Sequence, residues 1–113
     1  YRFDYDLHLA PHRFGAGHAL ELPFIFNTFD QPDFNIFFTR HYVKKAKGLS
    51  EAMMRYWANF ARSGDPNGSG LMNWPKYDCE QRMRMYFGLT QKVAATDNVE
   101  KCEFWTSQNV RLK

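Results

Sequence analysis

Residues 49–67 read LSEAMMRYWANFARSGDPN and give the clearest structural signal in the chain. Its large apolar side chains recur at intervals of three and four residues: Leu49, Ala52, Met53, Tyr56, Trp57 and Phe60. That spacing predicts an amphipathic helix with one wide apolar face buried in the core. We expect Ser50 to be its N-cap, Gly64 to end it in the left-handed conformation and Pro66 to stop it. The residues that follow, 65–70, are typical of a surface turn.

Shorter patterns predict the other elements. Residues 1–8 and 83–89 each alternate between two sets of side chains, which indicates two strands. A short helix is expected over residues 34–46, ending near Gly48. Its aromatic side chains are expected to pack in a core or an interface rather than line a substrate entrance: Phe34, Phe37, Phe38 and Tyr42.

A last helix is expected over residues 98–107. Asp97 and Glu100 have the spacing of a capping box at its start. The side chains expected to be buried in this helix are Val99, Cys102 and either Phe104 or Trp105.

Aromatic residues make up 18% of the chain, so we expect many of them to face a neighbouring segment outside it.

Composition limits the class of protein. A chain of 113 residues fits at most one domain, and 44% hydrophobic with 24% charged residues is typical of a globular protein. The net charge of +3 is mild and the only basic cluster is at residues 44–47, so we expect no nucleic-acid partner. No apolar run is long enough to span a membrane. Cys79 and Cys102 could pair with each other, stay free or pair with partners outside the chain.

Residues 15–26 read GAGHALELPFIF and contain the candidate general base, His18. Imidazole suits that role because its pKa of about 6.5 lets it accept a proton and return it near neutral pH. From the residues alone, a loop histidine hydrogen-bonded to a backbone carbonyl is the commoner role. No G-x-S-x-G motif occurs in the chain, so a nucleophilic serine of that type is absent from it.

Two other histidines, His8 and His12, are four residues apart. They fall across a predicted strand end and a proline-containing loop, and no third ligand stands at a suitable spacing. We therefore predict surface roles for both and expect neither a metal nor a cofactor.

Several segments together resemble the type-B carboxylesterase and cholinesterase-like lipase family. Residues 15–26 resemble the segment that carries its catalytic histidine, and residues 49–67 resemble its helix-and-turn signature. Residues 74–78 and 102–105 resemble the segments that follow. The resemblance implies an α/β fold, with residues 1–113 forming the C-terminal portion of an α/β-hydrolase domain: edge strands of the central sheet with packed helices. The remainder of the domain would lie upstream.

The resemblance also implies roles for individual residues. In this family the triad follows the order Ser, acid, His, and only the histidine, His18, falls within the chain. Glu21 is expected to support it from nearby, because the triad acid comes from an earlier strand end. The implied function is serine carboxylesterase activity through an acyl-enzyme, with a small-molecule ester as substrate. The partner would be the N-terminal portion of the same protein, and the isolated chain is expected to be inactive.

Two alternatives stay open from the sequence. Some relatives in this family keep the fold, lose the triad and act as adhesion or scaffold proteins, and the retained His18 argues against that reading without excluding it. An autonomous small binding domain is the weakest reading, because two predicted strands do not make a stable sheet alone. The compartment, secreted or cytoplasmic, and the ester specificity are left open.

Overall fold

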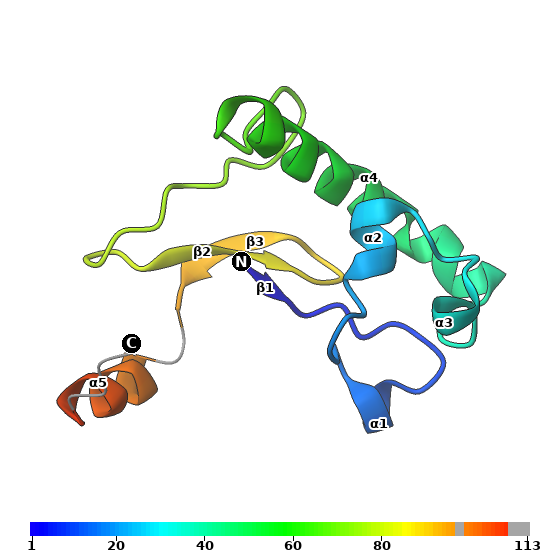
Figure 1. The fold of residues 1–113 in the computed structure, drawn as a ribbon, viewed down its shortest axis with the longest axis horizontal. Coiled ribbons are helices and arrows are strands. Elements are labelled where there is room, and N and C mark those ends of the chain that lie inside the picture. The colour runs from blue at the N-terminus through cyan, green and yellow to red at the C-terminus, as the bar shows by residue number, and fades with distance from the viewer. Residues whose placement is uncertain (97–98, 109–113) are drawn as a thin grey trace.

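The computed structural model describes residues 1–96 and 99–108, which form a small sheet and five helices (Figure 1). The elements in chain order are β1 (Arg2–Phe3), α1 (Pro11–Phe14), α2 (Leu22–Phe26), α3 (Pro32–Asn35), α4 (Arg40–Ser63), β2 (Met83–Phe87), β3 (Lys92–Ala95) and α5 (Val99–Ser107).

Helix α4 is one continuous helix of 24 residues. The predicted break near Gly48 is wrong: a helical glycine costs about 1 kcal/mol relative to alanine, and burial of Ala46 and Leu49 on either side offsets that cost. The prediction of Ser50 as N-cap is also wrong, because Ser50 lies inside the helix and Thr39 is the N-cap. The other end is as predicted, because Gly64 has φ 76° and ψ 2° and donates its N–H to the Phe60 carbonyl oxygen.

The three strands form one sheet in the order β1-β2-β3. Strand β1 is parallel to β2, with Phe3 opposite Phe87, and β2 is antiparallel to β3, with Met83 opposite Ala95. The strand predicted at residues 83–89 is confirmed over Met83–Phe87, whereas the one predicted at residues 1–8 is paired only at Arg2–Phe3. A strand needs a neighbour along its whole length to form a ladder, and within the described residues β1 has only β2.

The core is a cluster of aromatic rings around Phe24 of α2, whose side chain is fully buried. Its ring meets those of Phe3, Tyr5, Phe29 and Phe38 edge-on, at centroid distances of 4.9–5.5 Å. Phe38 is 2% exposed, which confirms the expectation of core packing for that residue.

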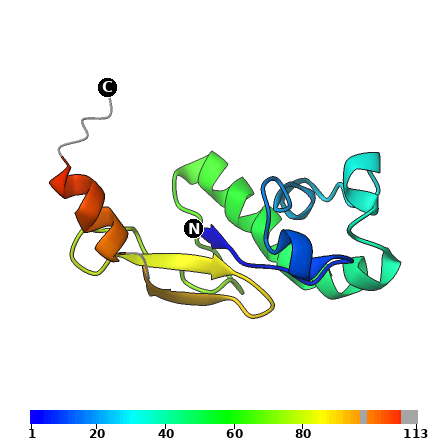
Figure 2. The same ribbon diagram turned by 90° about the horizontal axis from the view of Figure 1, so that it is seen from below.

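Helix α5 lies apart from the other helices in two perpendicular views (Figures 1 and 2). The predicted helix is therefore present over Val99–Ser107, but its predicted burial is wrong, since Cys102 is exposed and Phe104 and Trp105 are 55% and 61% exposed. Neither Phe104 nor Trp105 is among the residues packed against the hydrophobic core of the described chain. The predicted capping residue Asp97 lies outside the described residues.

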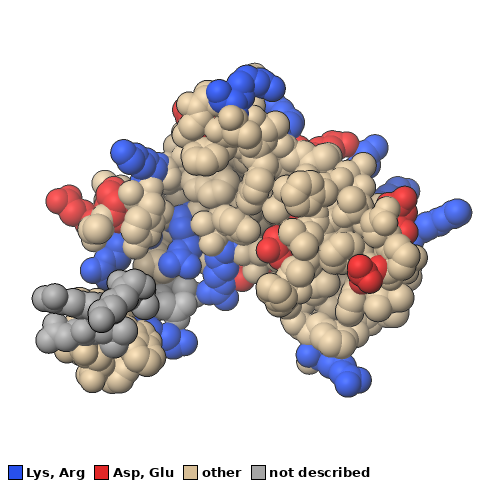
Figure 3. Space-filling view, in the orientation of Figure 1, with Lys and Arg blue, Asp and Glu red and all other residues tan. Residues whose placement is uncertain are grey.

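Lys and Arg side chains are spread over the surface, with one group where the sheet lies beside α5 (Figure 3). Tyr86 of β2 has two cationic neighbours: Lys92 and Arg2 place their cationic groups 5.2 and 5.9 Å from its ring centroid. Both cysteines are free and exposed. Among the described residues, no helix has both the length and the apolar character of a membrane span.

Candidate functional site: the histidine loop

The histidine loop, residues 15–21, joins α1 to α2 and depends on two glycines. Gly15 has φ 53° and ψ −145°, a backbone conformation that side chains rarely tolerate, and its N–H donates to the Pro11 carbonyl oxygen over 2.8 Å. A Cβ atom on Gly17 would lie 3.0 Å from the backbone oxygen of Phe14. Glycine therefore favours the close turn that leads to His18, through the positive φ at Gly15 and the tight contact at Gly17.

The far end of the loop is a tight hydrogen-bonded turn. The Leu20 N–H donates to the Gly17 carbonyl oxygen over 3.3 Å, and the Leu22 N–H donates to the Ala19 carbonyl oxygen over 3.1 Å. Ala19 has φ 66°, and Leu20 is 5% exposed against the core. Burial of Leu20 anchors this end of the loop.

His18 lies at the surface of this turn and is exposed. Within the described residues, neither nitrogen of its ring has a hydrogen-bond partner. Both nitrogens are therefore free to meet groups from outside the described chain.

Glu21 is half-buried at the start of α2. Burial raises the pKa of the Tyr1 phenol, and the negative charge of Glu21 raises it further. No hydrogen bond or ion pair joins Glu21 to His18 in the described part of the chain. The two residues share one turn, but the structure does not bring their side chains together.

The sequence missed a third residue of this region, His8. The prediction of a surface role is wrong, because His8 is 1% exposed and its Nε2 lies 2.8 Å from the Gly15 carbonyl oxygen. Two hydrogen bonds and two neighbouring aromatic rings compensate for burial of its polar ring. Those rings lie far along the chain, so no local pattern could have indicated them. His12 is exposed, as predicted.

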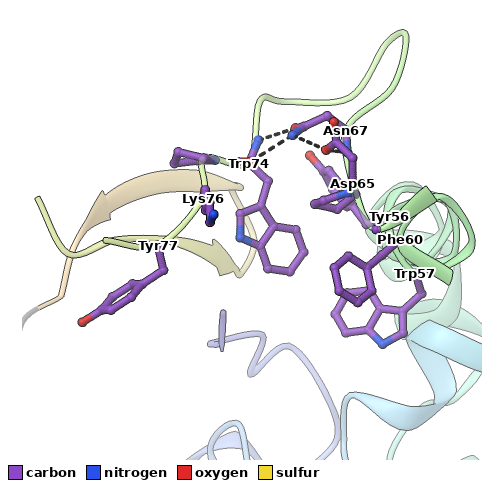
Figure 4. A pocket seen from close by; sticks show the side chains of 11 residues that line it. Tyr56, Trp57, Phe60, Asp65, Asn67, Trp74, Lys76 and Tyr77 are labelled. Carbon is purple, nitrogen blue, oxygen red and sulfur yellow. Dashed lines mark hydrogen bonds between the residues drawn. The ribbon is translucent and has the colours of Figure 1, made fainter. Parts of the chain in front are cut away.

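A cavity of about 770 Å³ opens at the C-terminal end of α4 (Figure 4). Trp57, Phe60, Trp74 and Tyr77 are among its lining residues, whereas His18 and Glu21 are not. Phe60, predicted to be core, is instead 60% exposed at this cavity. The cavity is therefore separate from the histidine loop.

Residues 65–67, Asp-Pro-Asn, form a turn that positions Trp74, one of the residues that line this cavity. The Trp74 N–H donates to Asn67 Oδ1 over 2.6 Å, and Asn67 Nδ2 donates to the Trp74 carbonyl oxygen over 3.0 Å (Figure 4). Asp65 Oδ1 in turn accepts from the backbone and side-chain nitrogens of Asn67. Asn67 thus connects the segment around Trp74 to the turn that follows α4.

In the described part of the chain, no three His, Cys, Asp or Glu side chains lie close enough to hold a metal ion.

A sheet that combines parallel and antiparallel strands, with α4 and α2 packed together beside it, is an α/β arrangement. The match to the carboxylesterase family covers residues 1–105, and the chain belongs to that family.

Similar proteins agree with this assignment. The chain is 39% identical over 97 residues to a medium-chain fatty acyl-CoA hydrolase precursor from Anas platyrhynchos. It is 37% identical over 100 residues to a cocaine esterase from Homo sapiens. Each match covers 86% of this chain and 16% of the relative, so the chain spans about one sixth of the length of these curated relatives.

Solved structures give the same result for the fold. The Geobacillus stearothermophilus carboxylesterase EST55 superposes with a TM-score of 0.73 at 33% identity, over 93% of this chain and 21% of that one. A PNB esterase superposes with a TM-score of 0.75 at 30% identity, over 91% of this chain and 20% of that one. The chain therefore has the fold of one part of an α/β-hydrolase carboxylesterase.

Proposed function

We propose that this chain supplies the general base, His18, of a serine carboxylic-ester hydrolase. The nucleophilic serine and the triad carboxylate would come from the part of the enzyme outside these 113 residues. Membership of the carboxylesterase family and the names of the relatives support ester hydrolysis. The relatives are several times longer than this chain, which supports a division of the triad between it and the rest of the domain.

One observation carries the proposal: His18 has an exposed, unpartnered ring on a turn that is anchored at both ends. An exposed imidazole without a partner in the described chain keeps both ring nitrogens available. A general base needs one free nitrogen for the nucleophile and the other for an orienting carboxylate. Strand β1 pairs on one side only within the described residues, so its other edge is open to further strands of a hydrolase sheet.

The chemistry follows from the two states of imidazole. One nitrogen of His18 takes the proton of the serine hydroxyl while the serine oxygen attacks the ester carbonyl carbon. The imidazolium then gives that proton to the leaving alcohol, and the carbon–oxygen bond to the alcohol breaks to leave an acyl-enzyme. In the second half, His18 takes a proton from water as the water attacks the acyl carbon. It returns the proton to the serine as the carboxylic acid leaves.

Glu21 would support the loop rather than act as the triad acid. Its half-buried carboxylate lies at the start of α2, where a negative charge is favourable near the helix N-terminus. This position is consistent with holding the end of the histidine loop while a carboxylate from outside the chain orients His18.

The test uses the intact enzyme that contains this chain, assayed for hydrolysis of p-nitrophenyl esters and for labelling by a fluorophosphonate. The substitution His18→Ala should lower kcat by about 10³-fold or more and should suppress labelling, because the serine loses its base. The matched control is His12→Ala, an exposed histidine in α1, which should leave both unchanged. Full activity of His18→Ala would contradict the proposal. Absence of hydrolysis and labelling in the unsubstituted enzyme would instead favour a catalytically silent adhesion or scaffold protein.

A further inference from the structure

We propose that His8 is a positioning residue for His18. The buried ring of His8 would hold Gly15, the first residue of the histidine loop, through a hydrogen bond to the Gly15 carbonyl oxygen. This inference rests on the proposed function, because it assigns His8 a part in placing the general base.

Two hydrogen bonds define the tautomer of His8. The Ala10 N–H points at Nδ1 over 3.3 Å, and a backbone amide can only donate, so Nδ1 carries no proton. Nε2 therefore carries the proton of the neutral ring and donates it to the Gly15 carbonyl oxygen over 2.8 Å. Both ring nitrogens are used, and the ring has a single orientation that satisfies both.

Packing fixes that orientation further. The ring of His8 meets those of Phe37 and Phe38 edge-on, at centroid distances of 5.8 and 5.9 Å. Phe37 also meets the ring of Phe14 at 5.3 Å, and its carbonyl oxygen accepts a 3.0 Å hydrogen bond from the Leu9 N–H. His8 thus links the end of α1 to the segment before α4 and cannot turn without disturbing both.

The position of Gly15 connects this anchor to His18. Gly15 precedes His18 by three residues, and Leu20, buried in the core, follows it by two. His18 therefore lies in a short segment between Gly15, which is hydrogen-bonded to His8, and Leu20, which is buried in the core. Gly15 is held by two hydrogen bonds, its N–H to the Pro11 carbonyl oxygen and its carbonyl oxygen to His8, so loss of the His8 bond would leave its carbonyl group free to turn. A displacement of about 1 Å at a catalytic group can lower a rate by about 10²-fold.

The experiment compares two substitutions at His8 in the intact enzyme. His8→Phe keeps the ring and its contacts with Phe37 and Phe38 but removes both hydrogen bonds. His8→Gln keeps an N–H donor and an oxygen acceptor on a flexible chain. We expect His8→Phe to lower kcat by about 10- to 100-fold with KM within about twofold, because the base is displaced and the ester pocket is not. We expect His8→Gln to recover most of that loss.

Two controls separate positioning from folding. His12→Phe changes an exposed histidine of α1 and should leave kcat unchanged. Tyr56→Phe removes a hydrogen bond to the Met72 carbonyl oxygen, away from the histidine loop, and should lower the unfolding temperature while keeping kcat per active site. Prolonged titration with the fluorophosphonate counts the molecules with a reactive serine, so that kcat refers to folded enzyme in every variant.

Three results would overturn the inference. The first is a kcat per active site for His8→Phe equal to that of the unsubstituted enzyme while His18→Ala is inactive; the proposed function would then stand without it. The second is a kcat for His8→Gln no higher than that for His8→Phe. The third is full activity of His18→Ala, which would remove the proposed function itself and the positioning role with it.

Discussion

The hydroxyl group of Ser50 donates a 2.8 Å hydrogen bond to the backbone carbonyl oxygen of Phe24. Both residues are buried, with exposures of 2% and 0%. This bond joins the middle of α4 to α2, which begins directly after the histidine loop. The long helix thus holds the element to which the loop is attached.

Substitution of Ser50 by alanine should destabilise the intact protein by about 1–3 kcal/mol, because the Phe24 carbonyl group would stay buried without a side-chain partner. Urea unfolding measures the loss. Ser69→Ala is the matched control, since Ser69 lies in an exposed turn, and it should change the free energy of unfolding by less than about 0.5 kcal/mol. Equal stability of the two variants would show that the Ser50 bond contributes nothing.

Two glycine-to-alanine substitutions should have opposite effects. A Cβ atom at Gly48 or at Gly15 meets no atom within 4 Å, but Gly48 lies inside α4 whereas Gly15 has φ +53°. Gly48→Ala should therefore stabilise the protein by about 0.5–1 kcal/mol through helix propensity. Gly15→Ala should destabilise it by about 1–3 kcal/mol through backbone strain.

Thermal unfolding of both glycine variants checks this pair. Available space is the same at the two positions, so the comparison isolates backbone conformation. A stabilising Gly15→Ala would mean that the loop relaxes to a negative φ without cost. A destabilising Gly48→Ala would mean that something outside the described residues occupies that face of α4.

Two buried tyrosines should also respond differently to loss of the hydroxyl group. Tyr56 donates a 2.6 Å hydrogen bond to the Met72 carbonyl oxygen, whereas the hydroxyl of Tyr5 has no partner in the described residues. At pH 7, Tyr56→Phe should cost about 1 kcal/mol and Tyr5→Phe should be neutral or slightly stabilising. Urea unfolding of both variants gives the comparison. A large loss in Tyr5→Phe would reveal a partner from outside the chain.

The same tyrosines predict how stability changes at high pH. Burial raises the pKa of both phenols above the ordinary value of 10.0, with the charge of Asp6 adding to the effect at Tyr5. The folded state therefore favours the neutral phenol. Its stabilising contribution is complete below about pH 10 and is lost as the pH rises through the folded-state pKa. Tyr5→Phe should lose less stability than the unsubstituted protein between pH 9 and pH 12, a range that thermal unfolding can cover.

The isolated chain should be partly unfolded and hydrolytically inactive. Its radius of gyration is 16.0 Å, whereas a self-contained domain of this length has about 13 Å. Large apolar side chains also remain exposed on it, among them Phe60 and Trp105 at 60% and 61%. We expect strong binding of the dye ANS, a broad thermal transition and no ester turnover. A sharp, reversible two-state melt would contradict this prediction, and the intact protein is the control.

Local signals predicted the elements whose ends depend on backbone preference. Gly64 and Pro66 located the end of α4, and alternation located β2, because each acts within a few residues. Gly48 misled the prediction, since the cost of a helical glycine is small compared with burial of the side chains around it. Strand β3 was missed because the sequence KVAA shows no alternation, and its pairing with β2 creates it.

In the candidate site, too, local features could be predicted from the sequence and contacts between distant segments could not. His18 was predicted from its glycine-rich context and from a family resemblance. His8 was misjudged, because its partners Phe37 and Phe38 meet it only after the chain folds back. In α5 the helix was predicted correctly and its burial was not, because burial depends on what packs against Phe104 and Trp105.

Side-chain periodicity and backbone preference were enough to predict an amphipathic helix over residues 49–63 and the turn that follows it, because both are properties of neighbouring residues. The family was indicated by resemblance of whole segments, among them the glycine-rich loop that carries His18. Only the tertiary structure decided that α4 runs unbroken, that Ser50 bonds to Phe24 and that His8 holds Gly15. Each of these is a contact between distant segments, and its free energy exists only once the core has brought them together.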